Sequence, residues 1–324
     1  MANENKIPHP ITRREAIKAA AAAAVLPLVS TSPVWAKENA TANHSPTIGI
    51  ATLGFGEYSN EQLARELAET GIHTVQLFLN QTDSRYWRYN GRSDVSDLTA
   101  PRCQAIAEAY RSAGITIHSI GVYTNLIHPD EKERNANLAY FEAMMKIGGH
   151  MGVRKFITEA GEYHSETEVP PVPYHFQKEV WDQMVKTGKK LSELAQAQDA
   201  TVLFEPFYRG FFASAKRTRL FLEEVDSPHI KALLDPANLI EINDIEEMFA
   251  QLSPWIQCLH AKDRKLHIDQ GVPAGQGDLD YKTLVTAAAR YAPEAPFILE
   301  YVGPHDYQQA LALLHDAISA AKPD

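Results

Sequence analysis

Four short apolar runs in the second half of the chain each end in an ionisable side chain. Three of them end in a carboxylate, at Glu205, Asp235 and Glu300, and the fourth, W-I-Q-C-L, ends in His260. An unpaired charge is costly to bury, so an ionisable residue at the end of a buried strand needs a partner or a function. Successive members are 30, 25 and 40 residues apart, close to the roughly 30 residues of one strand–helix unit in a (β/α)₈ barrel. The spacing therefore predicts strands of one barrel that bring the four groups to one rim.

The rest of the chain continues the same alternation. Strands are expected at 46–53, 73–78, 115–122, 153–159, 201–205, 230–235, 255–260 and 297–300. Each is followed by a segment with helical spacing or helix boundary signals. Unbroken strand–helix alternation implies parallel strands and right-handed crossovers. The expected fold class is therefore α/β, a (β/α)₈ TIM barrel.

The first residues have the pattern of an export signal. Two adjacent arginines, Arg13 and Arg14, precede an 11-residue apolar run at 19–29, and a small-residue cleavage site ends at Ala36. That run is well short of the roughly 20 residues that span a bilayer, so we expect no stable membrane anchor. The pattern resembles a bacterial twin-arginine signal, which implies recognition by the Tat export machinery and a periplasmic location; the alternative is a helix with two chance arginines. The expected segments are a signal peptide at 1–36, a linker at 37–45 and the barrel at 46–324.

Composition and charge exclude several classes of protein. Hydrophobic residues make up 44% of the 324 residues and charged residues 22%, as in ordinary globular proteins. The net charge of −10 argues against a nucleic-acid partner, whose phosphates attract Lys and Arg. Cys103 is expected on a helix and Cys258 inside a strand far from it, so we expect no disulfide. No G-x-G-x-x-G motif follows the first strand, which disfavours a dinucleotide-binding fold.

The four strand-end groups match the ligands of a metal ion. Carboxylates and an imidazole that converge at one rim are what a divalent cation requires. We therefore predict that Glu205, Asp235, His260 and Glu300 bind one divalent ion. For each carboxylate alone, the alternative is a turn or a helix cap, and for His260 it is a core histidine.

Other polar residues near the expected rim have less specific patterns. Lys262 and Asp263 either pair with each other or order the metal ligands. His118 and Glu159 are candidate substrate-binding groups, with a structural role as the alternative for each. The Gly-rich loop at 272–279 could bind a phosphate through backbone N–H groups, or could be a tight turn.

Five motifs together carry a family resemblance: L-F-E-P-F, L-L-D-P-A-N-L, C-L-H-A-K-D-R, A-G-Q-G-D-L-D-Y and I-L-E-Y. In this order they resemble the sugar phosphate isomerase/epimerase family, also called xylose-isomerase-like barrels. The resemblance implies a small-molecule sugar substrate and one divalent ion at the four predicted ligands. The expected ion is Mn²⁺, with Mg²⁺, Co²⁺ or Zn²⁺ as alternatives. In the ketose 3-epimerase branch the glutamates that match Glu205 and Glu300 are also catalytic, because they exchange protons with the substrate.

The same branch suggests which residues bind substrate. Arg209 and Asn238 stand where that branch has an Arg and a His that contact the sugar. The chain differs from the branch in having Phe211 for an acidic contact, Gln76 for a Glu, and K-D-R after His-Ala for the pattern G-E-x-N-R. These differences leave the metal ligands intact and the sugar open. The candidate substrate-binding set is Arg209, Asn238, Lys262, Asp263, Arg264, His118 and Glu159.

The predicted activity follows from these residues. A cation that binds a carbonyl and a neighbouring hydroxyl stabilises an enediolate, so a carboxylate can remove the adjacent proton. The leading hypothesis is a metal-dependent isomerase or epimerase of a sugar or keto-sugar. The alternatives are a lyase or dehydratase of a keto-sugar or keto-glycoside with the same site, and a non-catalytic periplasmic sugar-binding barrel. An abasic-site endonuclease is opposed by the charge and the export signal, and the sequence leaves open whether the chain forms a homo-oligomer.

Overall fold

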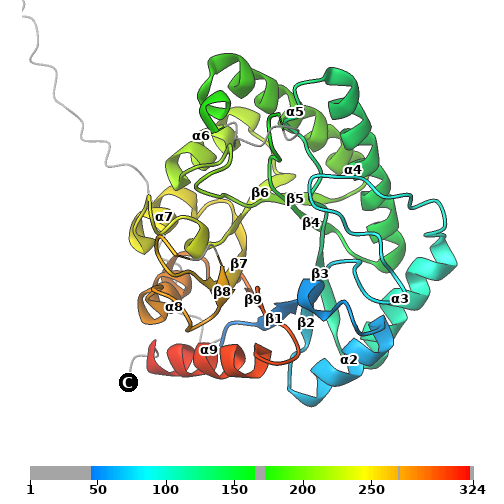
Figure 1. Cartoon of the computed structure of the whole chain (residues 1–324), viewed down its shortest axis with the longest axis vertical. Helices are drawn as coiled ribbons and strands as arrows, with labels where there is room; N and C mark the ends of the chain where they lie inside the picture. The colour runs from blue at the N-terminus through cyan, green and yellow to red at the C-terminus, as the bar shows by residue number, and fades with distance from the viewer. Residues whose placement is uncertain (1–44, 165–171, 269–270, 322–324) are drawn as a thin grey trace, which may run out of the picture. The chain divides into compact units, whose positions relative to one another are not determined.

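The barrel closes through parallel strands. The computed structural model describes residues 45–164, 172–268 and 271–321, so the expected signal peptide and all but the last residue of the linker lie outside the described residues. Within them, β1 (Ile48–Ala51) pairs with β2 (Thr74–Leu77) on one side and with β9 (Phe297–Leu299) on the other. The remaining barrel strands are β3 (Thr116–Gly121), β4 (Lys155–Thr158), β5 (Thr201–Phe204), β6 (Ile230–Leu234) and β7 (Ile256–Asp263). All the pairings around this ring are parallel, which confirms the expected closed barrel (Figure 1).

Helices surround the strands and follow them in the expected alternation. They are α2 (Asn60–Glu69), α3 (Ala100–Ser112), α4 (Glu131–Met151), α5 (Lys178–Ala197), α6 (Ala215–Val225), α7 (Ile245–Leu252), α8 (Tyr281–Tyr291) and α9 (Tyr307–Ala321). Most begin at a side chain that accepts a backbone N–H of the first turn, as good N-caps do. The capping residues are Ser59, Asp130, Ser214, Asp244 and Asp280.

The end of β7 is longer than the sequence suggested. We expected the strand to end at His260, but it continues to Asp263 because its last residues pair with a short antiparallel strand, β8 (Val272–Pro273). Lys262 lies opposite Pro273 in this pairing. The hairpin extends β7 beyond the rim and fixes the backbone next to the predicted ligands.

The barrel interior is filled by one residue from each strand or from the two positions after it. These residues are Ala51, Phe78, Tyr123, Ile157, Leu203, Leu233, Cys258 and Ile298. A second and larger apolar cluster packs the outside of the strands against the helices. Cys103 on α3 and Cys258 in β7 are buried free thiols. No helix in the described ranges is long and apolar enough to cross a bilayer.

Candidate metal centre

The four predicted ligands converge at the C-terminal rim of the barrel. All are buried: Glu205, Asp235 and Glu300 directly follow β5, β6 and β9, and His260 lies in β7. The Nδ1 atom of His260 lies 3.3 Å from Glu205 Oε1, 3.5 Å from Asp235 Oδ2 and 3.4 Å from Glu300 Oε2. Oxygen and nitrogen ligands of an ion such as Zn²⁺ lie about 2.0–2.2 Å from it, so neighbouring ligands are about 3.0–3.5 Å apart. The spacing fits one divalent cation.

Two of these ligand atoms have no hydrogen-bond partner among the residues that the structure describes. Asp235 Oδ2 and His260 Nδ1 are both buried and lack a hydrogen bond, and Asp235 Oδ2 has an ion pair with Lys262 Nζ. One ligand atom from each of the four residues lies within 4.8 Å of the others. Buried polar atoms are rarely left unpaired, and those that are need an explanation. An ion at the centre of the four residues would supply it.

The hydrogen bond at His260 Nε2 determines the tautomer of the imidazole. His260 Nε2 lies 2.8 Å from Gln76 Oε1 at the end of β2. If Nε2 donates its proton to this oxygen, Nδ1 carries the lone pair and faces the three carboxylates. Metal-binding histidines are commonly oriented in this way by a partner behind them. Gln76 therefore has a role where the ketose 3-epimerase branch often has a Glu.

Lys262 lies among the ligands. Its Nζ is 2.9 Å from Asp235 Oδ2 and 3.0 Å from Glu300 Oε2. The ring of Tyr301 covers the ammonium group at 4.5 Å. Burial alone would raise the pKa of Glu300, but the Lys262 ammonium and His260 lower this pKa well below its ordinary value. The lysine thus keeps Glu300 ionised and offsets part of the negative charge that the carboxylates share.

Two neutral hydrogen-bond donors hold the Glu205 carboxylate. Its Oε2 accepts a 2.7 Å hydrogen bond from Tyr123 Oη, and its Oε1 accepts a 2.9 Å bond from Asn238 Nδ2. These two donors leave the carboxylate oriented toward the ligand centre. They are neutral, so they position the group without cancelling its charge.

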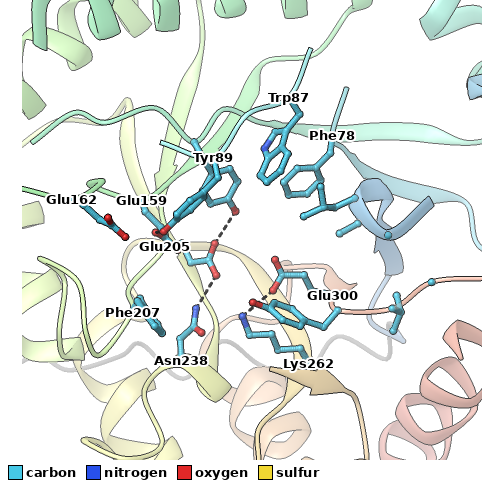
Figure 2. A pocket seen from close by; sticks show the side chains of 17 residues that line it. Phe78, Trp87, Tyr89, Glu159, Glu162, Glu205, Phe207, Asn238, Lys262 and Glu300 are labelled. Carbon is cyan, nitrogen blue, oxygen red and sulfur yellow. Dashed lines mark hydrogen bonds and ion pairs between the residues drawn. The ribbon is translucent and has the colours of Figure 1, made fainter. Parts of the chain in front are cut away.

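A cavity of about 720 Å³ opens above the ligands. Glu205, Asn238, Lys262 and Glu300 lie in its lining, together with Glu159 and Glu162. Figure 2 shows Phe78 and Trp87 on the opposite side of this cavity from Glu159 and Glu162. Pockets of this kind, with a few convergent polar groups, are the usual form of a small-molecule site.

A family model of xylose isomerase-like TIM barrels matches residues 64–317. The chain belongs to this family. Comparison with curated proteins gives no match.

Solved structures share the fold at low sequence identity. A D-psicose 3-epimerase from Clostridium cellulolyticum H10 is 15% identical with a TM-score of 0.65, and the match covers 84% of this chain and 99% of that one. A probable 3-DHS dehydratase, AsbF from Bacillus anthracis, is 17% identical with a TM-score of 0.66, covering 84% and 98%. The 3-keto-D-glucoside 4-epimerase YcjR from E. coli is 17% identical with a TM-score of 0.64, covering 84% and 99%. The solved structures that share this fold thus include sugar epimerases and a probable dehydratase.

Four of the candidate substrate-binding residues do not line the cavity. Arg209 is exposed, and His118 lies deeper in β3 beside Lys155, with Nε2 3.4 Å from the lysine Nζ. Arg264 is buried, with its guanidinium 4.1 Å from the centre of the Tyr208 ring. Asp263 is the fourth. Short-range sequence patterns placed these residues near the rim but could not show which way each side chain points.

Asp263 organises the loop that follows β7. Its carboxylate accepts backbone N–H groups of Arg264, Gly275 and Leu279, at 2.8, 3.1 and 2.9 Å. A Cβ atom at Gly277 would lie 2.3 Å from Asp263 Oδ1, so only glycine fits there. The Gly-rich loop therefore wraps a carboxylate of the same chain, and two of the N–H groups considered for a phosphate are already bonded to it.

Glu159 reaches the cavity from the end of β4. Its Oε2 accepts a 2.8 Å hydrogen bond from Oη of Tyr89, which belongs to the loop after β2. Burial and the nearby Glu205 raise the pKa of Glu159 to about 8. The cavity lining thus holds carboxyl groups, Glu159 among them, in addition to those of Glu205 and Glu300.

Several lining residues were not in the predicted site. Trp87 and Tyr89 belong to the long loop between β2 and α3, whose length and aromatic content were the available signal. Tyr301 has a φ of 57°, which is uncommon outside glycine, and it directly follows Glu300. Nothing in the sequence around Tyr301 indicated that backbone conformation.

Proposed function

We propose that the protein is a metal-dependent isomerase or epimerase of a sugar or keto-sugar. The observation that carries the proposal is the meeting of three buried carboxylates and one imidazole below a cavity that two of those carboxylates also line. Glu205 and Glu300 are these two, so each can face both an ion and a substrate. The structural similarity to sugar epimerases supports the same class of reaction.

Each residue of the site has a separate role in the proposed proton transfer. A divalent ion at the four ligands, for which Mn²⁺ is our first choice, would act as a Lewis acid and make the C–H next to a substrate carbonyl more acidic. One of Glu205 and Glu300 accepts that proton as a general base, and the other returns a proton. Return to the opposite face of the same carbon gives an epimer, and return to the neighbouring carbon gives an aldose–ketose isomer. Asn238 and Tyr123 hold Glu205 in place during the transfer.

A lyase or dehydratase is the second candidate. Glu159 favours it, because a protonated carboxyl beside the reacting sugar can give its proton to a departing oxygen. The raised pKa of Glu159 is consistent with this role. The likeness to a probable dehydratase also supports it.

The proposed test is deuterium exchange. Metal-loaded protein is incubated with a panel of keto-sugars and keto-glycosides in D₂O, and products are followed by NMR. We expect deuterium in recovered sugar for an isomerase or epimerase, and release of water or an aglycone for a lyase. Ligand binding without exchange or release on any panel member would instead support the non-catalytic sugar-binding barrel. A sample treated with EDTA is the control and should be inactive.

We also propose that the chain is exported to the periplasm by the twin-arginine route. The support is the Arg13-Arg14 pair ahead of the short apolar run. Cell fractionation of the full chain and of a variant with both arginines changed to lysine tests this. We expect the wild type in the periplasmic fraction and the variant in the cytoplasm.

A further inference from the structure

The substrate cavity has two chemically different halves. One half, the polar lobe, is lined by Glu159, Glu162, Glu205, Asn238, Lys262 and Glu300. The other half, the apolar lobe, is lined by Leu53, Gly54, Phe78, Trp87, Val302 and Gly303. Figure 2 shows Phe78 and Trp87 across the cavity from Glu159 and Glu162. The ligand centre belongs to the polar lobe.

The apolar lobe comes from neighbouring strand ends of the barrel. Its residues follow β9, β1 and β2, which are adjacent in the strand order. A Cβ atom at Gly54 would lie 2.1 Å from Val302 O, so the turns after β1 and β9 can touch only because residue 54 is glycine. The apolar lobe is therefore a continuous surface of packed turns.

Trp87 is fixed in this lobe by the fold. Its backbone N–H donates to Leu79 O at 2.8 Å, and its indole packs edge-on against Phe78, with ring centres 5.6 Å apart. The indole Nε1 is covered by protein and has no hydrogen-bond partner in the described part of the chain. What Trp87 offers to a ligand is consequently the carbon surface of its ring.

A sugar ring does not suit the apolar lobe. The side chains of Leu53, Phe78 and Val302 carry no hydrogen-bonding group, and Trp87 Nε1 is covered. Each sugar hydroxyl buried there would lose its bonds to water without replacement, which is unfavourable. The polar lobe has the opposite character, because its carboxylates, amide and ammonium group can bond several hydroxyls at once.

We propose that the substrate is a glycoside whose apolar aglycone, a ring-sized group, occupies the apolar lobe while its sugar lies in the polar lobe. This inference rests on the proposed function, because it assumes that the polar lobe binds a sugar at the ligand centre. The size of the cavity agrees with it. At about 720 Å³, the cavity falls in the range of roughly 300–1,000 Å³ typical for ligands larger than one sugar ring.

The test compares matched pairs of glycosides that differ only in the aglycone. Methyl and phenyl glycosides of the same sugars are titrated into the Mn²⁺-loaded protein by calorimetry. Because contact with aromatic and aliphatic side chains strengthens binding, we expect the phenyl glycoside to bind about tenfold more tightly than the methyl glycoside. Trp87→Ala and Leu53→Ser should each reduce this ratio toward one.

Phe207→Ala is the matched control. Phe207 also lines the cavity but lies away from Trp87 and Phe78 in Figure 2, so its loss should leave the phenyl-to-methyl ratio unchanged. Equal affinities in the wild type would overturn the inference, as would a ratio that survives in both Trp87→Ala and Leu53→Ser. Because the readout is binding, it is independent of turnover. Deuterium exchange into free keto-sugars together with equal affinities would overturn the aglycone site and leave the proposed function standing.

Discussion

The two ends of the barrel both hold ionisable side chains, yet they differ in how those side chains are partnered. At the C-terminal rim, His260 Nδ1 and Asp235 Oδ2 are buried without a hydrogen bond from the described residues, and the charged partner of Asp235 Oδ2 is Lys262. Toward the N-terminal end, His118 bonds Ser119 Oγ at 3.2 Å and lies beside Lys155, and both of its ring nitrogens have a neighbour. The comparison teaches that several ionisable side chains converging on one centre, with buried atoms that lack a hydrogen bond, indicate a ligand site better than a single buried ionisable residue does.

The pKa values show the same contrast. Burial opposes the charged form of His260, but Glu300 and Glu205 raise its pKa well above the ordinary value. Burial and Lys155 lower the pKa of His118 to about 4. The C-terminal end thus attracts positive charge, and the other end keeps its imidazole neutral.

The largest effect should come from removing a carboxylate of the rim. Glu300→Gln keeps the shape of the side chain but loses the charge that binds an ion and accepts a proton. We expect the rate of deuterium exchange to fall by about 10²–10⁴-fold, the usual contribution of a general base, or more if the ion is also lost. NMR in D₂O with metal-loaded protein measures the rate. Wild-type rates in this variant would remove Glu300 from the chemistry.

The next effect concerns the lysine among the carboxylates. Lys262→Met leaves Asp235 and Glu300 buried without their cation, so the free energy of unfolding of the metal-free protein should fall by about 3–5 kcal/mol. Because an ion can replace the lost charge, added Mn²⁺ should stabilise the variant more than the wild type. Urea unfolding with EDTA and with Mn²⁺ measures both changes. A variant as stable as the wild type in EDTA would show that Lys262 does not neutralise the rim.

A smaller effect, on Mn²⁺ affinity, is expected when the hydrogen bond between Gln76 and His260 is removed. Gln76→Leu removes the acceptor of His260 Nε2, so the Kd for Mn²⁺ should rise about 10–100-fold, as when other outer partners of metal ligands are lost. Gln81→Leu is the matched control, because Gln81 is equally buried but donates to Thr52 O instead. If both variants bind Mn²⁺ like the wild type, Gln76 does not orient the ligand.

The smallest effect, on the pH dependence of stability, is expected for His118 toward the N-terminal end of the barrel. The folded pKa of His118, about 4, is below the ordinary 6.5, so its stabilising contribution is complete above 6.5 and is lost as pH falls toward 4. His118→Asn should therefore lose less stability than the wild type between pH 7 and pH 5. Deuterium exchange at pH 7 should hardly change. Urea unfolding at both pH values gives the comparison, and a large loss of exchange would instead connect His118 to the reaction.

Much of the fold and the four ligands could be predicted because they depend on chain order. In a parallel barrel every strand ends at the same rim, so Glu205, Asp235 and Glu300 had to meet once the strands were located. The convergence of these side chains could be predicted without knowledge of packing. The same holds for His260, because it lies near the C-terminal end of β7, the barrel strand that follows β6.

Side-chain direction and loop paths could not be predicted in this way. His118 lies only a few residues before the end of β3, yet that distance moves it away from the cavity. The register of β2 against β3 shifts between Val75 and Gln76, which no short sequence pattern shows. Trp87 belongs to a loop whose course is set by its own backbone hydrogen bonds and by contacts with distant residues.

The most direct test of the account is a titration of Mn²⁺ into protein freed of metal by EDTA, followed by calorimetry. For the wild type we predict one ion bound per chain. Asp235→Asn replaces one ligand charge by a neutral amide and should lose this binding, while His118→Asn should keep it. A wild type that binds no divalent ion, or an Asp235→Asn variant that binds it as tightly, would contradict the metal centre proposed for Glu205, Asp235, His260 and Glu300.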